Sequence, residues 1–278
     1  ALQDPAPLDL RVNTLKASRD EVLAKLVADG HAAVPTPFSP IGIRLQGRPS
    51  INRLPLFTSG AIEVQDEGSQ LLGYLLAPRR SDLVVDFCAG AGGKTLMLGA
   101  LMHSQGRVYA FDISQKRLAN LKPRLKRSGL SNLHPLVIAH ENDTKVKRLA
   151  GKIDRVLVDA PCSGLGTLRR NPDLKFRQSP QTVAELVVKQ TAILNAAARL
   201  VKPGGRLAAV VIEPVIEEEN QQIIAAFLAA HPQFSALDCA ELLRRQDIAL
   251  DCGAQLQLWP HLHRTDGFFA AALECTGV

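Results

Sequence analysis

A cysteine in a polar loop is the first candidate for chemistry in this sequence. Cys162 lies in DAPCSGLGT at residues 159–167, with Asp159 before it and the pair Arg169-Arg170 after it. A single cysteine is most often a small buried hydrophobic residue. Nearby positive charge, however, favours the thiolate, which is the nucleophilic form of the side chain. The loop therefore predicts a sulfur nucleophile beside a substrate, with Arg169 and Arg170 as contacts to that substrate.

A glycine-rich turn, DFCAGAGGKT at residues 86–95, is the second candidate. Such a turn lets the backbone approach a ligand closely in front of a helix N-terminus. A P-loop would have glycine six residues before Lys94, where Cys88 stands, and this disfavours ATP and GTP. A dinucleotide fingerprint beginning at Gly90 would have its third glycine at Thr95. The looser turn after an acidic residue suits the ribose and methionine parts of S-adenosylmethionine.

Acidic residues also follow the next two apolar runs. Asp112 ends RVYAFD, in the place where a carboxylate meets ribose hydroxyls in related nucleoside sites. Asp143 comes after the third run, and we expect it at the adenine edge. A single glycine turn or strand-end acid is ordinary in α/β proteins, so the prediction of a nucleoside cofactor rests on the ordered set of three.

Alternating apolar runs and helix-like segments must position these residues. The runs predict strands at 83–87, 107–112, 134–140, 154–160 and 205–213, and helix-like segments occupy 93–102, 114–130 and 181–200. Pro123 is expected to bend the second of these helices. Strands buried on both faces and alternating with helices predict an α/β fold, a doubly wound, mostly parallel Rossmann-like sheet. A last strand is predicted at 267–275.

The N-terminal part predicts a small α/β lobe. LDLRVN reads as a strand, a helix begins at Ser18 and runs through Val27, and IGIRLQ reads as a second strand. A bridging strand and helix follow within 61–80. We therefore divide the chain into a lobe at 1–60 and a catalytic domain at 61–278. Arg11 and Asn13 lie on the first strand, where a contact with RNA phosphate or sugar and a surface salt bridge are the two alternatives.

Composition sets broad limits on the function. The 278 residues are 46% hydrophobic and 22% charged, which predicts a soluble, globular protein without a membrane segment. The net charge of +6 is a weak indication of a polyanionic partner. The five cysteines form no CxxC pair and the histidines show no ligand spacing, so we expect no metal, no disulfide framework and a cytoplasmic monomer. The chain does not begin with methionine, as expected of a piece of a longer protein.

Motifs along nearly the whole chain resemble one known family. They are LRVNTLK at the start, VQDEGSQ, DFCAGAGGKT, FDISQKRL, DAPCSGLGT with RRNPD, KPGGRL and WPHLHRTDGFFAA. Together they closely resemble the Fmu/Sun (RsmB-type) family of S-adenosylmethionine-dependent ribosomal-RNA cytosine-5 methyltransferases. Many members carry a helical RNA-binding domain before this point, which this sequence lacks.

The resemblance implies a site and a partner. Residues 1–60 would be a small RNA-binding lobe, the partner would be ribosomal RNA, and Cys162, Asp159 and Lys94 would act on the substrate. The implied cofactor-binding residues are Cys88, Ala89, Gly90, Gly92, Gly93, Lys94, Asp112, Arg117, Asp143 and Asp159. Their places in the sequence, rather than the resemblance, give the residues expected to bind RNA, which are Arg11, Asn13, Arg169 and Arg170.

The implied chemistry uses cysteine because cytosine C5 is a poor nucleophile. A thiolate first adds at C6, C5 then attacks the methyl group, and a base removes the C5 proton. The family divides the work between two cysteines, of which Cys162 matches the one assigned to product release. The attacking cysteine would stand at residue 212, a few residues after Gly204-Gly205, but this sequence has Ile212 there.

Three interpretations of Ile212 stay open. The chain could bind cofactor and RNA with little or no turnover, Cys162 could be the attacking thiolate as in DNA cytosine-5 methyltransferases, or the reaction could differ, with Glu213 as a base. A solvated strand-end role for Glu213 is the simpler expectation. Our leading hypothesis is methyl transfer to C5 of a cytosine in small-subunit ribosomal RNA. A methyltransferase acting on protein or a small molecule is the remaining alternative.

Overall fold

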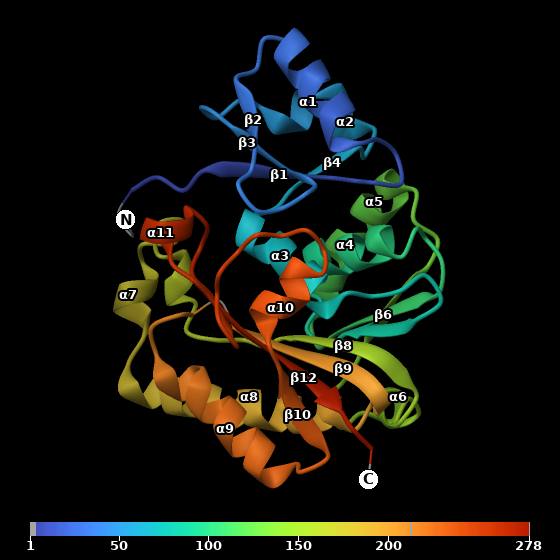
Figure 1. Cartoon of the computed structure of the whole chain (residues 1–278), viewed down its shortest axis with the longest axis vertical. Coiled ribbons are helices and arrows are strands. Elements are labelled where there is room, and N and C mark those ends of the chain that lie inside the picture. Colours follow the sequence, from blue (N-terminus) through green and yellow to red (C-terminus); the bar gives the residue numbers. More distant parts are fainter. Residues whose placement is uncertain (1–3, 212, 278) are drawn as a thin grey trace.

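The computed structural model describes residues 4–211 and 213–277 and contains two sheets (Figure 1). The larger sheet has eight strands, with β10-β12-β9-β8-β5-β6-β7 in spatial order and β11 paired to β12. Strands β5 to β9 run parallel, whereas β12 lies antiparallel between β9 and β10. The mostly parallel Rossmann-like fold predicted from the sequence is confirmed. None of the helices in the described ranges has the length and apolar character needed to cross a bilayer.

The strands of this sheet are short and mostly buried. Their bounds are β5 Leu83–Asp86, β6 Arg107–Asp112, β7 Leu133–Val137, β8 Ile153–Asp159, β9 Val201–Val211, β10 Phe234–Leu237, β11 Leu256–Leu258 and β12 Phe268–Cys275. Valine, leucine and alanine fill both faces of β8 and β9, as expected where helices cover both sides of a sheet.

Helices cover the two faces of the sheet (Figure 1). One face carries α3 (Glu67–Leu76), α4 (Gly93–Leu101) and α5 (Gln115–Ser128), and the other carries α8 (Pro180–Ala198) and α9 (Gln221–Ala230). The α5 helix continues through Pro123. Short helical segments complete this part of the chain: α6 Thr144–Lys147, η2 Leu165–Thr167, α7 Leu174–Arg177, η3 Glu217–Glu219, α10 Cys239–Arg244 and α11 Pro260–His263.

The N-terminal lobe is built on a four-stranded sheet in the order β2-β3-β1-β4. Its elements are β1 Leu8–Val12, α1 Arg19–Ala28, β2 Ala33–Pro35, β3 Gly42–Leu45, η1 Ile51–Arg53, α2 Pro55–Thr58 and β4 Ile62–Val64. Ser18 and Glu21 form the capping box that begins α1. Strand β4 pairs with β1 and lies just beyond residue 60, where we placed the end of the lobe.

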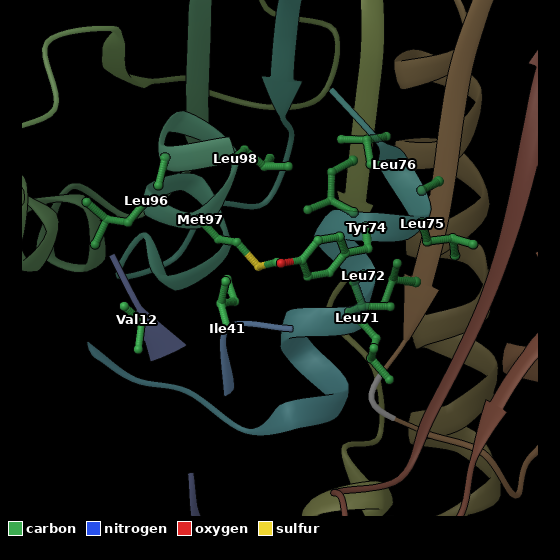
Figure 2. Close-up of a cluster of buried hydrophobic side chains, with 14 of the residues drawn as sticks. Val12, Ile41, Leu71, Leu72, Tyr74, Leu75, Leu76, Leu96, Met97 and Leu98 are labelled. Atoms are coloured by element: carbon green, nitrogen blue, oxygen red, sulfur yellow. The ribbon is translucent and has the colours of Figure 1, made fainter. Parts of the chain in front are cut away.

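One hydrophobic core joins the lobe to the larger sheet. Figure 2 shows Val12 and Ile41 of the lobe near Tyr74 of α3 and Met97 of α4, and all four are buried. Gly73 allows α3 and α4 to pack closely, since a Cβ there would lie 2.6 Å from Met97 Cε. The lobe is therefore packed against the catalytic part rather than tethered to it.

Candidate functional site

A cleft of about 650 Å³ opens at the carboxyl ends of the parallel strands. This is the edge where open α/β sheets bind ligands. Its wall includes seven of the predicted residues: Cys88, Ala89, Gly90, Asp112, Arg117, Asp159 and Cys162. The cleft therefore brings the glycine-rich turn and the cysteine loop together.

The glycine-rich turn owes its shape to two left-handed residues. Gly90 has φ 56° and Gly92 has φ 80°, a region that other residues enter at a cost. Gly92 is the N-cap of α4, and Gly93 is that helix's first residue. Gly90 N donates to Asp112 Oδ2 at 2.8 Å, which joins the turn to the end of β6. The backbone is thus fixed close to the space that a ligand would fill.

Asp112 is a buried carboxylate that already accepts three hydrogen bonds. Its Oδ1 accepts from Ser114 N at 2.7 Å and from Arg117 at 3.0 Å, and its Oδ2 accepts from Gly90 N. A carboxylate has about four lone-pair sites, so one remains for a ribose hydroxyl. The glycine turn, this acceptor and the size of the cleft fit S-adenosylmethionine.

The adenine edge differs from the expectation for Asp143. Asp143 is the N-cap of α6, and its carboxylate accepts from Ala139 N at 2.8 Å and from Lys145 N at 2.9 Å. These backbone bonds lower the pKa of Asp143. The cleft wall is formed by Ala139, His140 and Glu141. Asp143 therefore shapes the loop, and Glu141 is the acidic residue placed to meet a ligand.

Lys94 reaches the site through an ion pair. Its Nζ donates to Asp159 Oδ2 at 2.7 Å and lies 5.9 Å from the centroid of the Phe268 ring. Both charged side chains are largely shielded, which strengthens their attraction relative to water. Asp159 Oδ1 is buried and accepts no hydrogen bond from the described residues. The carboxylate as a whole lines the cleft and keeps one fifth of its side-chain surface exposed.

Two further ionisable groups near the turn have raised pKa values. Burial raises the pKa of Asp86 to about 7, although Thr95 Oγ1 donates to its Oδ2 at 2.6 Å. Burial, with the neighbouring carboxylates Asp159, Asp86 and Asp112, also raises the pKa of the Cys88 thiol. Cys88 is therefore a poor source of thiolate, which leaves Cys162 as the candidate on the cleft wall.

The end of β9 corrects one sequence expectation. Ile212 lies outside the described residues, so its side chain is not placed. Glu213 is fully buried rather than solvated, and its Oε1 accepts from Val215 N and Ile216 N. Its pKa is raised by burial. Glu213 thus closes the turn that follows β9.

Arg11 and Asn13 do not face a surface that could take RNA. Both are almost completely buried, and Arg11 Nε donates to Gln65 Oε1 at 2.6 Å. Asn13 Nδ2 donates to the carbonyls of Gly60 and Ser128, which fastens the lobe to the end of α5. Their polar groups stabilise internal contacts, so we do not retain them as RNA contacts.

Arg169 and Arg170 belong to an ion cluster with Asp66 and Asp266. Arg169 Nε donates to Asp266 Oδ1 at 2.9 Å, and Arg170 Nε donates to Asp266 Oδ2 at 2.6 Å. Asp66 Oδ2 lies 3.6 Å from Arg169 and 3.0 Å from Arg170. Arg169 is buried in the cluster, and Arg170 retains one third of its side-chain surface. Of the four residues predicted to bind RNA, Arg170 alone has enough exposed side-chain surface for such a contact.

A second bridge connects the lobe to the cofactor turn. Glu63 of β4 accepts from Arg124 at 3.0 Å and also pairs with Arg127. Arg124 in addition donates from Nη1 to the carbonyl of Ala91 at 2.6 Å. No pattern in the sequence indicated this bridge, because Glu63 and Ala91 lie 61 and 33 residues before Arg124.

The fold and the cleft define a Rossmann-like methyltransferase, and comparison with known proteins gives the family. The model of the 16S rRNA methyltransferase RsmB/F family matches residues 73–274, and that of its ferredoxin-like domain matches residues 1–52. The chain therefore belongs to the RsmB/F family of 16S rRNA methyltransferases, whose cofactor is S-adenosylmethionine. The resemblance and the cofactor inferred from the sequence are confirmed.

Curated relatives support this assignment. Ribosomal RNA small subunit methyltransferase B from Sodalis glossinidius is 38% identical over 267 residues, covering 96% of this chain and 59% of that protein. A protein from Synechocystis named "Probable ribosomal RNA small subunit methyltransferase B" is 38% identical over 278 residues, covering 98% and 60%. The chain thus spans about three fifths of the length of these relatives.

Solved structures show the same fold. The crystal structure of PH0851 superposes with a TM-score of 0.88 at 35% identity, covering 98% of this chain and 60% of that one. NSun6 from Pyrococcus horikoshii with SFG has a TM-score of 0.86 at 20% identity, covering 100% and 93%. At that identity the second likeness concerns the fold alone.

Proposed function

We propose that this chain transfers a methyl group from S-adenosylmethionine to C5 of a cytosine in small-subunit ribosomal RNA. One observation carries the proposal: Cys162 and Asp159 share a single cleft with the glycine turn and Asp112. Family membership and the names of the curated relatives support the substrate class. The NSun6 structure was obtained with SFG, a cofactor analogue, which is consistent with the same cleft.

The residues of the cleft suit a covalent route. The Cys162 thiolate adds to C6 of the base, which makes C5 nucleophilic. S-adenosylmethionine would supply the methyl group that C5 takes up, and its S–CH3 bond would break to leave S-adenosylhomocysteine. A base then removes the proton from C5, and the C–S bond breaks to restore the thiolate. Because the thiolate must reach the face of the ring, the target base has to leave its stack.

Asp159 supports cytosine over uracil. Its carboxylate lines the cleft with one fifth of its side-chain surface exposed, and its Oδ2 is bonded to Lys94 Nζ. Cytosine presents an amino donor at N4, and uracil presents a carbonyl acceptor at the equivalent position. A carboxylate oxygen fixed by Lys94 would bind the first and repel the second.

The test is methyl transfer to a small-subunit ribosomal RNA transcript, with product nucleosides identified by mass. We expect 5-methylcytidine from the parent chain, at least about 100-fold less from Cys162→Ala, and a comparable loss from Asp159→Asn. Cys252→Ala is the matched control, because Cys252 lines a different pocket beside β10 and β12. Full activity of Cys162→Ala would contradict the proposal.

Ile212 gives a second candidate function, a scaffold that binds cofactor and RNA with little or no turnover. Isoleucine cannot form the adduct, so this scaffold would yield salt-dependent RNA binding without methylated product. Ile212→Cys separates the two functions. A gain of activity from a silent parent would favour the scaffold, whereas an active parent that depends on Cys162 would favour the first proposal.

A further inference from the structure

Ser163, the residue after Cys162, forms a hydrogen bond through its N–H, its hydroxyl and its carbonyl group. Its N–H donates to Glu219 Oε1 at 2.9 Å, and its Oγ donates to Glu213 Oε2 at 3.2 Å. Its carbonyl accepts from Gln178 Nε2 at 2.7 Å. These three partners come from the turn after β9, the η3 segment and the residue that ends α7. Ser163 is itself buried.

The residue before Cys162 is held by the same network. The Pro161 carbonyl accepts from Gln190 Nε2 of α8 at 3.0 Å. The same nitrogen donates to Glu219 Oε1 at 2.7 Å. Glu219 therefore connects to both neighbours of Cys162, directly to Ser163 and through Gln190 to Pro161.

The two glutamates are unusual in being both acidic and buried. Glu213 is fully buried and Glu219 is 2% exposed. Removing a carboxylate from water costs several kcal/mol unless strong hydrogen bonds compensate. An apolar pair would fill the same space without that cost, so stability alone does not account for their presence. Carboxylates do, however, make short, directional bonds to backbone N–H groups.

We infer that Glu213 and Glu219 are positioning residues that fix the backbone on both sides of Cys162 and so aim its thiol into the cleft. Neither glutamate lines the cleft. Catalytic groups function when held within about 0.5 Å of the productive geometry by buried supporting bonds. Glu213 also accepts from Ile216 N, so one carboxylate holds both the turn after β9 and the loop that carries Cys162.

The inference about orientation concerns the thiol itself, and only its kinetic consequence rests on the proposed function. The first readout is therefore the rate at which iodoacetamide alkylates Cys162 in the folded protein, measured by peptide mass spectrometry. The second is the split between kcat and KM for methyl transfer. Alkylation of Cys239, which is fully buried, monitors general unfolding.

The variants are Glu219→Ala, Glu219→Gln and Ser163→Ala, with Glu217→Ala as the matched control. Glu217 is on the same short η3 segment, but it is exposed. Glutamine at 219 keeps an oxygen that accepts from Ser163 N–H, so it is the conservative rescue. Ser163→Ala removes only the hydroxyl bonded to Glu213, and it carries the test if Glu219→Ala does not fold.

We expect Glu219→Ala to raise Cys162 alkylation about fivefold or more, because a released loop exposes the half-buried thiol. We expect kcat to fall roughly 10- to 100-fold with little change in KM for S-adenosylmethionine. Glu219→Gln should recover most of both, and Glu217→Ala should match the parent. Alkylation of Cys162 within twofold of the control in folded Glu219→Ala, or in Ser163→Ala, would overturn the inference. A parent that makes no 5-methylcytidine would refute the proposed function and leave the alkylation result decisive.

Discussion

Substitution by alanine should affect two glycines of the glycine-rich turn differently, one mainly in cofactor binding and the other mainly in stability. Gly90 and Gly92 are two residues apart and both have positive φ. Gly90 lines the cleft, and a Cβ there would meet no protein atom within 4 Å. A Cβ at Gly92 would lie 2.2 Å from Leu121 Cδ1 and 2.9 Å from Leu121 Cγ. Alanine at these positions therefore tests the ligand space and the protein core separately.

The expected magnitudes follow from these surroundings. A left-handed backbone costs an alanine about 1 kcal/mol, so Gly90→Ala should lower the free energy of unfolding by about that amount. Gly92→Ala adds overpacking against Leu121, which is fully buried and cannot move into solvent. Overpacking costs about 1–3 kcal/mol, for a total of about 2–4 kcal/mol. In contrast, the methyl group of Gly90→Ala occupies ligand space and should weaken cofactor binding about tenfold or more, which is about 1.4 kcal/mol.

The assays are urea unfolding and calorimetric titration with S-adenosylmethionine or its product. Each variant serves as the control for the other, since both carry one added methyl group in the same turn. The reasoning fails if the two variants lose equal stability, or if Gly92→Ala loses more cofactor affinity than Gly90→Ala.

Three further outcomes are expected. The pKa of Asp86 is about 7 in the folded protein, whereas that of an unfolded aspartate is near 4. The free energy of unfolding of the parent should therefore fall as pH rises from about 4 to about 7. Asp86→Asn should flatten this dependence when the urea midpoint is measured against pH. Gly60→Ala, whose Cβ would lie 2.1 Å from the Arg127 carbonyl oxygen, should cost about 3 kcal/mol or more, against about 1 kcal/mol for Gly30→Ala, which has open space; equal losses would refute this. Asp266→Asn removes one of two acidic partners from the arginine cluster and should cost about 2–4 kcal/mol in thermal unfolding, whereas a parent-like Tm would show that Asp66 alone suffices.

The sequence was sufficient for features that local pattern determines. Apolar runs predicted the buried parallel strands, and the glycines at 90, 92 and 93 predicted a tight turn before a helix. Asp112 and Cys162 each follow a predicted strand, and they share a cleft in the structure because the carboxyl ends of parallel strands lie at one edge. The start of the helix at Ser18 could also be predicted, because its capping box lies within four residues.

Features that depend on distant partners could not be predicted. Arg11 looks like a surface charge on a strand when the sequence is considered alone. In the structure it is buried and hydrogen-bonded to Gln65, which lies 54 residues later. Asp143 reads as a ligand contact, but its carboxylate is used by nearby backbone N–H groups. Glu213 looks solvated in isolation, yet the loop that carries Ser163 covers it. In each case a polar side chain serves an internal contact that sequence spacing does not reveal.

The ion cluster of Asp66, Asp266, Arg169 and Arg170 constrains how this chain can diverge. Two positive and two negative groups come from three stretches about 100 residues apart in sequence and compensate one another where water is largely excluded. Loss of any one leaves a shielded charge without its counterpart. The four positions should therefore change jointly between descendants of one ancestor, so that single exchanges are rare and paired ones are tolerated.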